Sequence, residues 1–154
     1  MTEDERQKLA VLKSSIKLES DADWSDYMKV CTELPITPDP EVLASMLSIL
    51  RDTPTGDPLW NLIEACERFP EDIYIKCLVK SASLIFKSAP EGLRLMLCTI
   101  LNDEKQNYAI LADAFDALDQ ENVAFFQRYS PELLKVSRKY ESTLSKLFSR
   151  KINM

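Results

Sequence analysis

Two pairs of carboxylates have a spacing that could support chemistry. Glu64 and Glu67 are three residues apart, and so are Asp113 and Asp116. On a helix such residues share one face, so each pair could act as a general acid and base or bind a hard metal ion. Like charges on exposed helices are also ordinary. We interpret both pairs as solvated acidic faces, with a surface for a basic partner as the functional alternative.

The other residue types argue against an enzyme. The sequence has no histidine, which is the commonest general base and metal ligand. Its two glycines, Gly56 and Gly92, are too isolated to form a phosphate-binding loop. The spacings of the four cysteines match no zinc or redox motif. We therefore expect no catalytic residue, no metal and no cofactor.

Trp60 and Asn61 belong to the predicted helix that carries the first acidic pair. The pattern of this helix turns its apolar side chains inward and leaves Trp60, Asn61, Glu64 and Glu67 on or near the other side. A tryptophan with flanking charge is typical of an interface anchor. Burial of Trp60 between two helical hairpins is an equally good alternative.

The charges are unevenly distributed. Residues 19–72 contain thirteen acidic residues against three basic ones, whereas residues 128–154 contain seven basic residues against two acidic ones. We expect an acidic end and a basic end. The net charge of −6 argues against nucleic-acid binding, which requires clustered Lys and Arg. Serines dilute the basic face near the C-terminus, so we expect no membrane binding either.

The sequence indicates a cytoplasmic protein. The N-terminus is charged and lacks the apolar run of a signal peptide, and no uncharged stretch is long enough to span a bilayer. The cysteines lie in apolar helical contexts without close pairs, which predicts reduced thiols in the core. These cysteines are Cys31, Cys66, Cys77 and Cys98.

Prolines indicate where several helices begin. The dipeptide Pro-Glu precedes an apolar run at residues 40–41, 70–71, 90–91 and 131–132. Proline loses no hydrogen bond at the first helical position, and the glutamate interacts favourably with the helix dipole. Asp57-Pro58 predicts a fifth start, and Asn102 or Asp103 can cap a sixth helix.

These signals predict an all-α fold of about eight helices, arranged as a compact stack of helical hairpins that is HEAT-like. We expect a single domain over residues 1–154. It would comprise an N-terminal hairpin at 1–34, central hairpins at 41–118 and one amphipathic helix at 131–150. A proline-rich connector from Pro35 to Pro40 would be a hinge. The helices after Pro70 and Pro90, apolar on most sides, would be the buried centre.

The central stretch resembles a family of helical bacterial immunity proteins, which are encoded beside polymorphic toxins, including those of contact-dependent growth inhibition. The resemblance covers roughly residues 41–118. Its motifs are Leu-Trp-Asn-Leu-Ile-Glu at 59–64, a helix start near Tyr74, Ala-Pro-Glu-Gly-Leu at 89–93 and Ile-Leu-Asn-Asp at 100–103. Shortly after Pro90-Glu91 the family leads us to expect an aromatic residue, where this chain has Gly92.

The resemblance implies a protein that binds and occludes the C-terminal domain of a cognate toxin, often a nuclease and therefore basic. We expect the protein itself to be a monomer. The candidate toxin-binding residues are Trp60, Asn61, Glu64, Glu67, Asn102, Asp103, Asp113 and Asp116. A helical-repeat adaptor for another protein would share all of these features. A carboxylate or metal-dependent enzyme is the second alternative.

Overall fold

The computed structural model describes residues 1–36, 38–53 and 57–152, and within them the fold is all-α, as predicted. The described residues form nine α-helices and two short 3-10 helices, and they contain no strand. The helices are α1 (Glu3–Ser15), α2 (Asp21–Glu33), η1 (Leu34–Ile36), α3 (Pro40–Ile49), α4 (Asp57–Glu67), α5 (Glu71–Ser88), α6 (Pro90–Asn102), α7 (Glu104–Asp116), α8 (Gln120–Val136), η2 (Arg138–Tyr140) and α9 (Glu141–Ile152).

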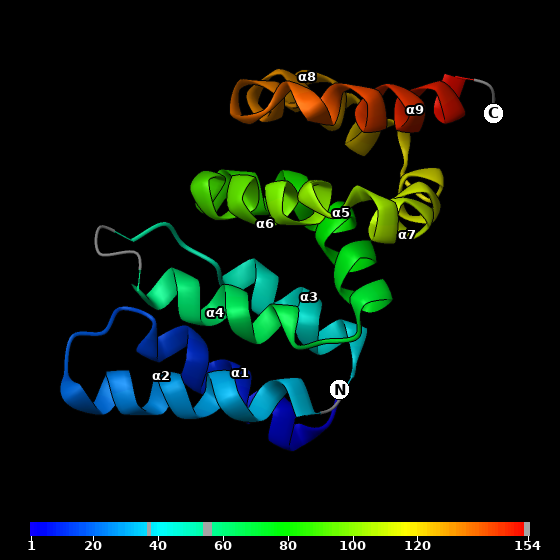
Figure 1. The fold of residues 1–154 in the computed structure, drawn as a ribbon. Coiled ribbons are helices and arrows are strands. Elements are labelled where there is room, and N and C mark those ends of the chain that lie inside the picture. The colour runs from blue at the N-terminus through cyan, green and yellow to red at the C-terminus, as the bar shows by residue number, and fades with distance from the viewer. Residues whose placement is uncertain (37, 54–56, 153–154) are drawn as a thin grey trace.

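The helices stack in two rows. The odd-numbered helices α1, α3, α5, α7 and α9 contact one another in succession, and the even-numbered helices α2, α4, α6 and α8 do the same. Figure 1 shows the α1–α2 hairpin at one end of this stack and α8 with α9 at the other. α5 lies in the middle, in contact with α3, α4, α6, α7 and α8. The prediction that the helix after Pro70 lies at the centre is thus confirmed.

Most of the helix starts were predicted correctly. Ser20 caps α2 by accepting a hydrogen bond from the Asp23 N–H, and α3 and α6 begin at Pro40 and Pro90. α5 begins one residue after Pro70. α4 begins at Asp57, and the loop before it lies partly outside the described residues.

The predicted helix start at Pro131 is wrong. Pro131 lies inside α8, which runs on to Val136. A proline at this position cannot donate to the carbonyl four residues earlier, that of Gln127. The Ser130 hydroxyl donates to that carbonyl instead, at 3.2 Å. This local replacement satisfies the carbonyl and allows the helix to continue.

The single amphipathic helix predicted over residues 131–150 is also wrong. The chain breaks at Ser137, whose backbone is extended (φ −157°, ψ 127°), and resumes in η2 and α9. The Ser137 hydroxyl accepts a hydrogen bond from the Lys139 N–H at 3.4 Å. Serine side chains compete with helical hydrogen bonding in this way, which favours a break at this position. The sequence pattern did not reveal the break because the helices on both sides of it face the same core.

The N-terminal hairpin packs on the helices that follow it. The buried Tyr27 hydroxyl in α2 donates to the carbonyl of Pro58 in α4, and Arg68 Nη1 donates to the Cys31 carbonyl at 3.4 Å. The connector predicted as a hinge contains the 3-10 turn η1, while Thr37 lies outside the described residues. Buried contacts and hydrogen bonds therefore join this hairpin to α4.

The four cysteines are free thiols, as expected. Cys31 and Cys66 are buried in the core, and Cys77 and Cys98 are half-buried. Burial raises the pKa of the Cys31 thiol to about 11. Among the described residues, no helix combines the length and apolarity that crossing a bilayer requires.

Candidate protein-binding surface

α4 presents the exposed face that its sequence pattern predicts. Leu59, Leu62, Ile63 and Cys66 are buried, and the 3.6-residue period turns the positions between them outward. Trp60 is 49% exposed, which decides between the two interpretations of this residue in favour of the surface. Glu64 and Glu67 are exposed beside it, and Asn61 is half-buried. We refer to Trp60, Asn61, Glu64 and Glu67 as the α4 face.

The α4 face holds negative charge in a partly desolvated position. The pKa of Glu67 is raised, first by burial of part of the side chain and second by the neighbouring charge of Glu64. Neither carboxylate forms an ion pair within residues 1–36, 38–53 and 57–152. A positive charge placed here would therefore relieve repulsion instead of displacing an internal partner.

A hollow of about 310 Å³ lies at the edge of the α4 face. It brings together Glu67 and Asp103, two of the predicted site residues that are far apart in the sequence. Residues from α4, α5, α6 and α7 line it. They are Glu67, Glu71, Tyr74, Ile75, Thr99, Ile100, Asp103 and Asn107. We refer to this feature as the acidic hollow. Glu71, Tyr74 and Asn107 were not predicted as site residues.

Asn102 and Asp103 occupy the corner between α6 and α7, but they differ in their contacts. The Tyr140 hydroxyl donates to Asn102 Oδ1 at 2.7 Å, which ties this side chain to η2. Asp103 is the residue before α7, yet its side chain makes no capping hydrogen bond. Its carboxylate is exposed and lines the acidic hollow. The predicted capping role at this corner is thus absent for Asp103.

The second predicted acidic pair does not act as two equivalent free carboxylates. Asp113 is exposed on α7. Asp116 accepts hydrogen bonds from Arg150 on α9, with Nε at 3.2 Å and Nη2 at 2.5 Å. The Arg150 guanidinium lowers the pKa of the Asp116 carboxyl. Neither residue lines the acidic hollow. Through its hydrogen bonds with Arg150, Asp116 joins α7 to α9 within the molecule.

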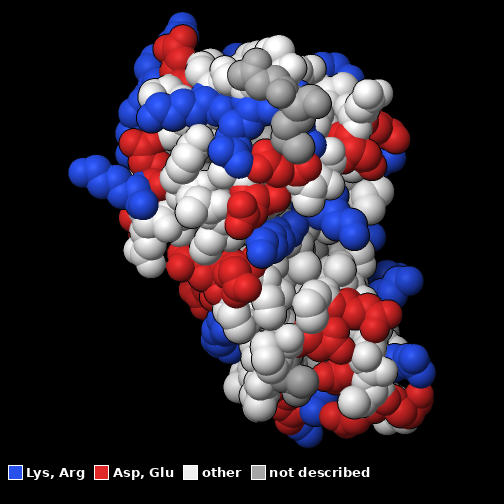
Figure 2. Space-filling view, turned by 90° about the vertical axis from the view of Figure 1, so that its right-hand side faces the viewer, with Lys and Arg blue, Asp and Glu red and all other residues white. Residues whose placement is uncertain are grey.

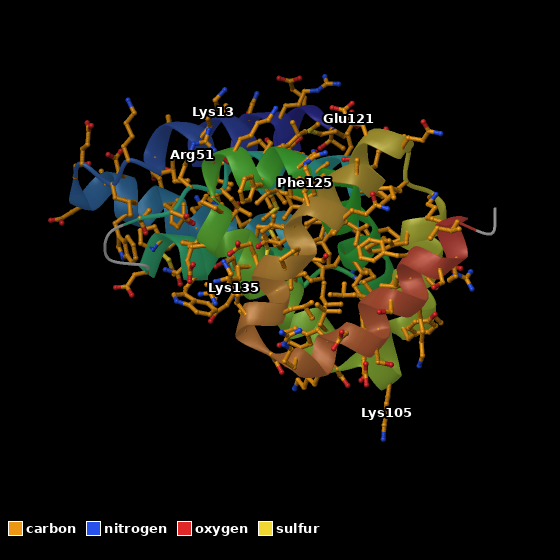
Figure 3. The ribbon with its side chains drawn as sticks, turned by 90° about the horizontal axis from the view of Figure 1, so that it is seen from above. Lys13, Arg51, Lys105, Glu121, Phe125 and Lys135 are labelled. Carbon is orange, nitrogen blue, oxygen red and sulfur yellow. The ribbon has the colours of Figure 1, made fainter. Side chains whose placement is uncertain are left out.

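A larger groove was not predicted from the sequence. It has a volume of about 810 Å³ and runs between α5, α6 and α8, where Phe86, Phe125 and Tyr129 line it. The Phe125 and Tyr129 rings stack at 5.4 Å between centroids, and Phe86 is 42% exposed. Figure 3 shows Phe125 and Glu121 one turn apart on α8. We refer to it as the aromatic groove. The four-residue spacing of Phe125 and Tyr129 would have indicated it, had a helix been predicted before Pro131, where α8 begins at Gln120.

The charge segregation is visible on the surface. Figure 2 shows a band of Lys and Arg side chains beside the C-terminal end of the chain, whereas the end formed by α1 and α2 carries more acidic side chains on this face. Part of the basic charge is engaged internally. Lys151 Nζ donates to the Asp116 and Leu118 carbonyls, each at 2.8 Å. Two of the cations in α9, Arg150 and Lys151, thus hold the helix in place.

Comparison with known families places this all-α chain among immunity proteins. The matching family model is described as Immunity protein 30 and covers residues 14–110, more than half of the 154 residues. The chain therefore belongs to the Immunity protein 30 family. No curated protein and no solved structure matches it. The matched region contains the α4 face and the whole acidic hollow, whereas α8, which forms one wall of the aromatic groove, lies beyond it.

Proposed function

We propose that this protein neutralises a cognate bacterial toxin by binding its C-terminal domain and occluding the surface that the toxin needs for activity. The partner would be basic, and a nuclease domain is the class that fits best. The toxin would belong to a polymorphic or contact-dependent growth-inhibition system, and the complex would form in the cytoplasm of the producing bacterium. The immunity protein would act as a monomer and without catalysis, bound metal or cofactor.

The observation that carries this proposal is the α4 face. It combines a half-exposed tryptophan with two glutamates that have no internal cation among the described residues. Aromatic side chains that are exposed in the free protein and buried in the complex are the usual centres of binding energy. The same face lies within the region that matches the family. Asn61, Asn102, Asp103 and Asp113 would extend the contact around it.

Charge supports a basic partner. A nuclease domain presents Lys and Arg to nucleic-acid phosphates, and an acidic inhibitor can compete for that surface. Complementary charge would speed association and discriminate against other partners. The inhibitor itself, with a net charge of −6, would bind neither nucleic acid nor an anionic membrane. Its two rows of stacked helices would present the binding surface as HEAT-type repeats do.

The decisive experiment is co-expression with the C-terminal domain of the toxin encoded next to the gene. We expect the wild type to rescue growth and to co-purify with that domain. Glu64→Lys combined with Glu67→Lys should abolish rescue and leave the melting temperature nearly unchanged, because both side chains are exposed.

Glu121→Lys combined with Glu132→Lys provides a matched control. It makes the same change in charge at the aromatic groove, which both residues line. Retained rescue by this control, together with loss at the α4 face, supports the proposal. If the α4 variant still rescues, or if only the groove variant fails, the α4 face is not the toxin-binding surface.

The aromatic groove favours a second candidate function, that of a helical adaptor for another protein. Its volume and its exposed Phe86 suit an apolar segment of a partner. The position of the gene distinguishes the two functions, because an immunity gene should lie directly downstream of a large toxin gene. An adaptor would show no such linkage and would not rescue growth.

A further inference from the structure

Two buried polar atoms in side chains that line the acidic hollow have no hydrogen-bond partner among the described residues. They are Tyr74 Oη and Asn107 Oδ1. Their side chains belong to residues that are only 6% and 5% exposed. Buried polar atoms are nearly always hydrogen-bonded in folded proteins, so two orphans in one hollow require an explanation.

The local geometry makes Asn107 an acceptor. Its Nδ2 donates to the Ile100 carbonyl at 3.2 Å, which fixes the amide and leaves Oδ1 without a donor. A tyrosine hydroxyl can also accept. Two acceptors without a donor thus belong to side chains that line the hollow, and a group that carries several N–H donors would satisfy both.

The rim of the hollow adds negative charge. Glu67, Glu71 and Asp103 are exposed, line the hollow and form no ion pair within the described part of the chain. Gln106 donates to Glu71 Oε2 at 3.4 Å, and no Lys or Arg lines the hollow. The pKa of the Tyr74 hydroxyl is raised, first by burial and second by the negative charge of Glu67. The Tyr74 hydroxyl and the Glu67 carboxylate therefore interact electrostatically.

The walls fit a long aliphatic stem. Ile75 and Ile100 line them, together with Thr99. A volume of about 310 Å³ is at the lower end of ligand pockets, and it suits one inserted side chain. Arginine and lysine bury their methylene stems against apolar walls and keep the charged head among polar groups.

We propose that the acidic hollow is a socket for one arginine or lysine side chain of the toxin, a proposal that rests on the proposed function. Its charged head would lie among Glu67, Glu71 and Asp103 and donate to Tyr74 Oη and Asn107 Oδ1. A metal ion fits less well, because the described residues contain no group of three or more acidic or cysteine side chains arranged to hold one.

The socket can be tested without the toxin. The probe is N-acetyl-arginine amide, titrated into the ¹⁵N-labelled protein, with N-acetyl-citrulline amide as its uncharged isostere. We expect saturable shifts of the Asn107 side-chain amide and the Tyr74 signals with the arginine probe alone. Equal shifts with citrulline, or none with arginine, would overturn the socket.

Variants of the hollow sharpen this test. Glu71→Gln combined with Asp103→Asn should weaken binding of the arginine probe at least tenfold. Tyr74→Phe, which removes only the hydroxyl oxygen, should weaken it several-fold. Glu121→Gln removes an exposed acid outside the hollow and should have no effect. Unchanged affinity in both hollow variants would contradict the assignment.

The toxin domain itself separates failure of the socket from failure of the proposed function. We expect Tyr74→Phe to weaken toxin binding about tenfold while the protein remains folded. If Glu64→Lys with Glu67→Lys abolishes toxin binding but neither hollow variant changes it, the socket is wrong and the immunity function stands. If the wild type does not bind the neighbouring toxin domain, the function itself fails.

Discussion

The carboxylate of Asp52 accepts a hydrogen bond from the backbone N–H of Gly92 at 3.1 Å, and a second from Glu91 at 3.0 Å. The residue that precedes α6, Ala89, cannot cap the helix with its own side chain. Asp52 also donates its own N–H to the Ser88 carbonyl at 3.4 Å. The loop after α3 thus supplies the missing cap from forty residues away and joins α3 to the α5–α6 junction.

Asp52→Ala should lower the free energy of unfolding by about 1 kcal/mol, which is typical for loss of a helix cap. Chemical denaturation gives the value directly. Asp52→Asn keeps one carbonyl oxygen and is the control. Its free energy of unfolding should fall clearly less than that of Asp52→Ala. Equal stability of Asp52→Ala and the wild type would show that water replaces this cap without cost.

Pro131→Ala should stabilise the protein by about 1 kcal/mol. Alanine restores the hydrogen bond to the Gln127 carbonyl and removes the clash of the proline ring, while greater freedom of the unfolded chain offsets part of the gain. Pro131 is exposed, so no packing is lost. Thermal unfolding measures the change. Ser130→Ala is the complementary variant and should destabilise, because the Gln127 carbonyl then loses the hydroxyl donor that replaces the missing N–H of Pro131.

The contrast between Asp52 and Pro131 shows which features of the fold the sequence could predict. Pro-Glu dipeptides located α3, α5 and α6, because proline at a helix start acts through its own backbone. At Pro131 the same signal was misleading, since the hydroxyl of Ser130 satisfied the helix instead. The glycine at position 92 is explained by tertiary packing and not by the local sequence. A Cβ there would lie 3.0 Å from Leu59 Cδ1, where α4 meets α6.

The ion pair between Asp116 and Arg150 should make the stability of the protein depend on pH in the acidic range. The pKa of Asp116 is lowered from its ordinary value of 3.8, so the contribution is fully present above that value. It declines as the pH falls below 3.8 and is lost below the lowered native pKa. Asp116→Asn should therefore reduce the melting temperature at pH 7 and match the wild type in strong acid.

Asp113→Asn, on the same helix but exposed, is the control for this pH series. It should leave the melting temperature close to that of the wild type across the range. A difference between Asp116→Asn and the wild type that persists in strong acid would mean that packing, and not charge, joins α7 to α9.

Trp60→Ala should weaken the toxin complex by about 2 kcal/mol or more, as expected for an aromatic centre of binding energy. Its effect on the free protein should stay within about 0.5 kcal/mol, since the side chain is 49% exposed. Trp24→Ala is the matched control, because Trp24 is 40% exposed on α2. Calorimetric titration with the toxin domain separates the two. Equal losses in both variants would contradict a specific role for Trp60.

The binding surface was only partly predictable. The helical period placed Trp60, Glu64 and Glu67 outward, because that pattern acts within one helix. Tyr74 and Asn107 were assigned no role, since the hollow they share forms only when α5 and α7 pack together. Asp116 looked free for the same reason, as its partner Arg150 lies 34 residues further along the chain.

The two rows of helices also determine which parts of the protein open together. Each outer helix is held mainly by its neighbours, so local opening can begin at α1 or α9 and stop before the middle. Amide protons of α5 should exchange with solvent last. Because the acidic hollow is built from α4 to α7, around this slowly exchanging centre, a partner would meet a surface that is already ordered and would spend little of its binding energy on arranging it.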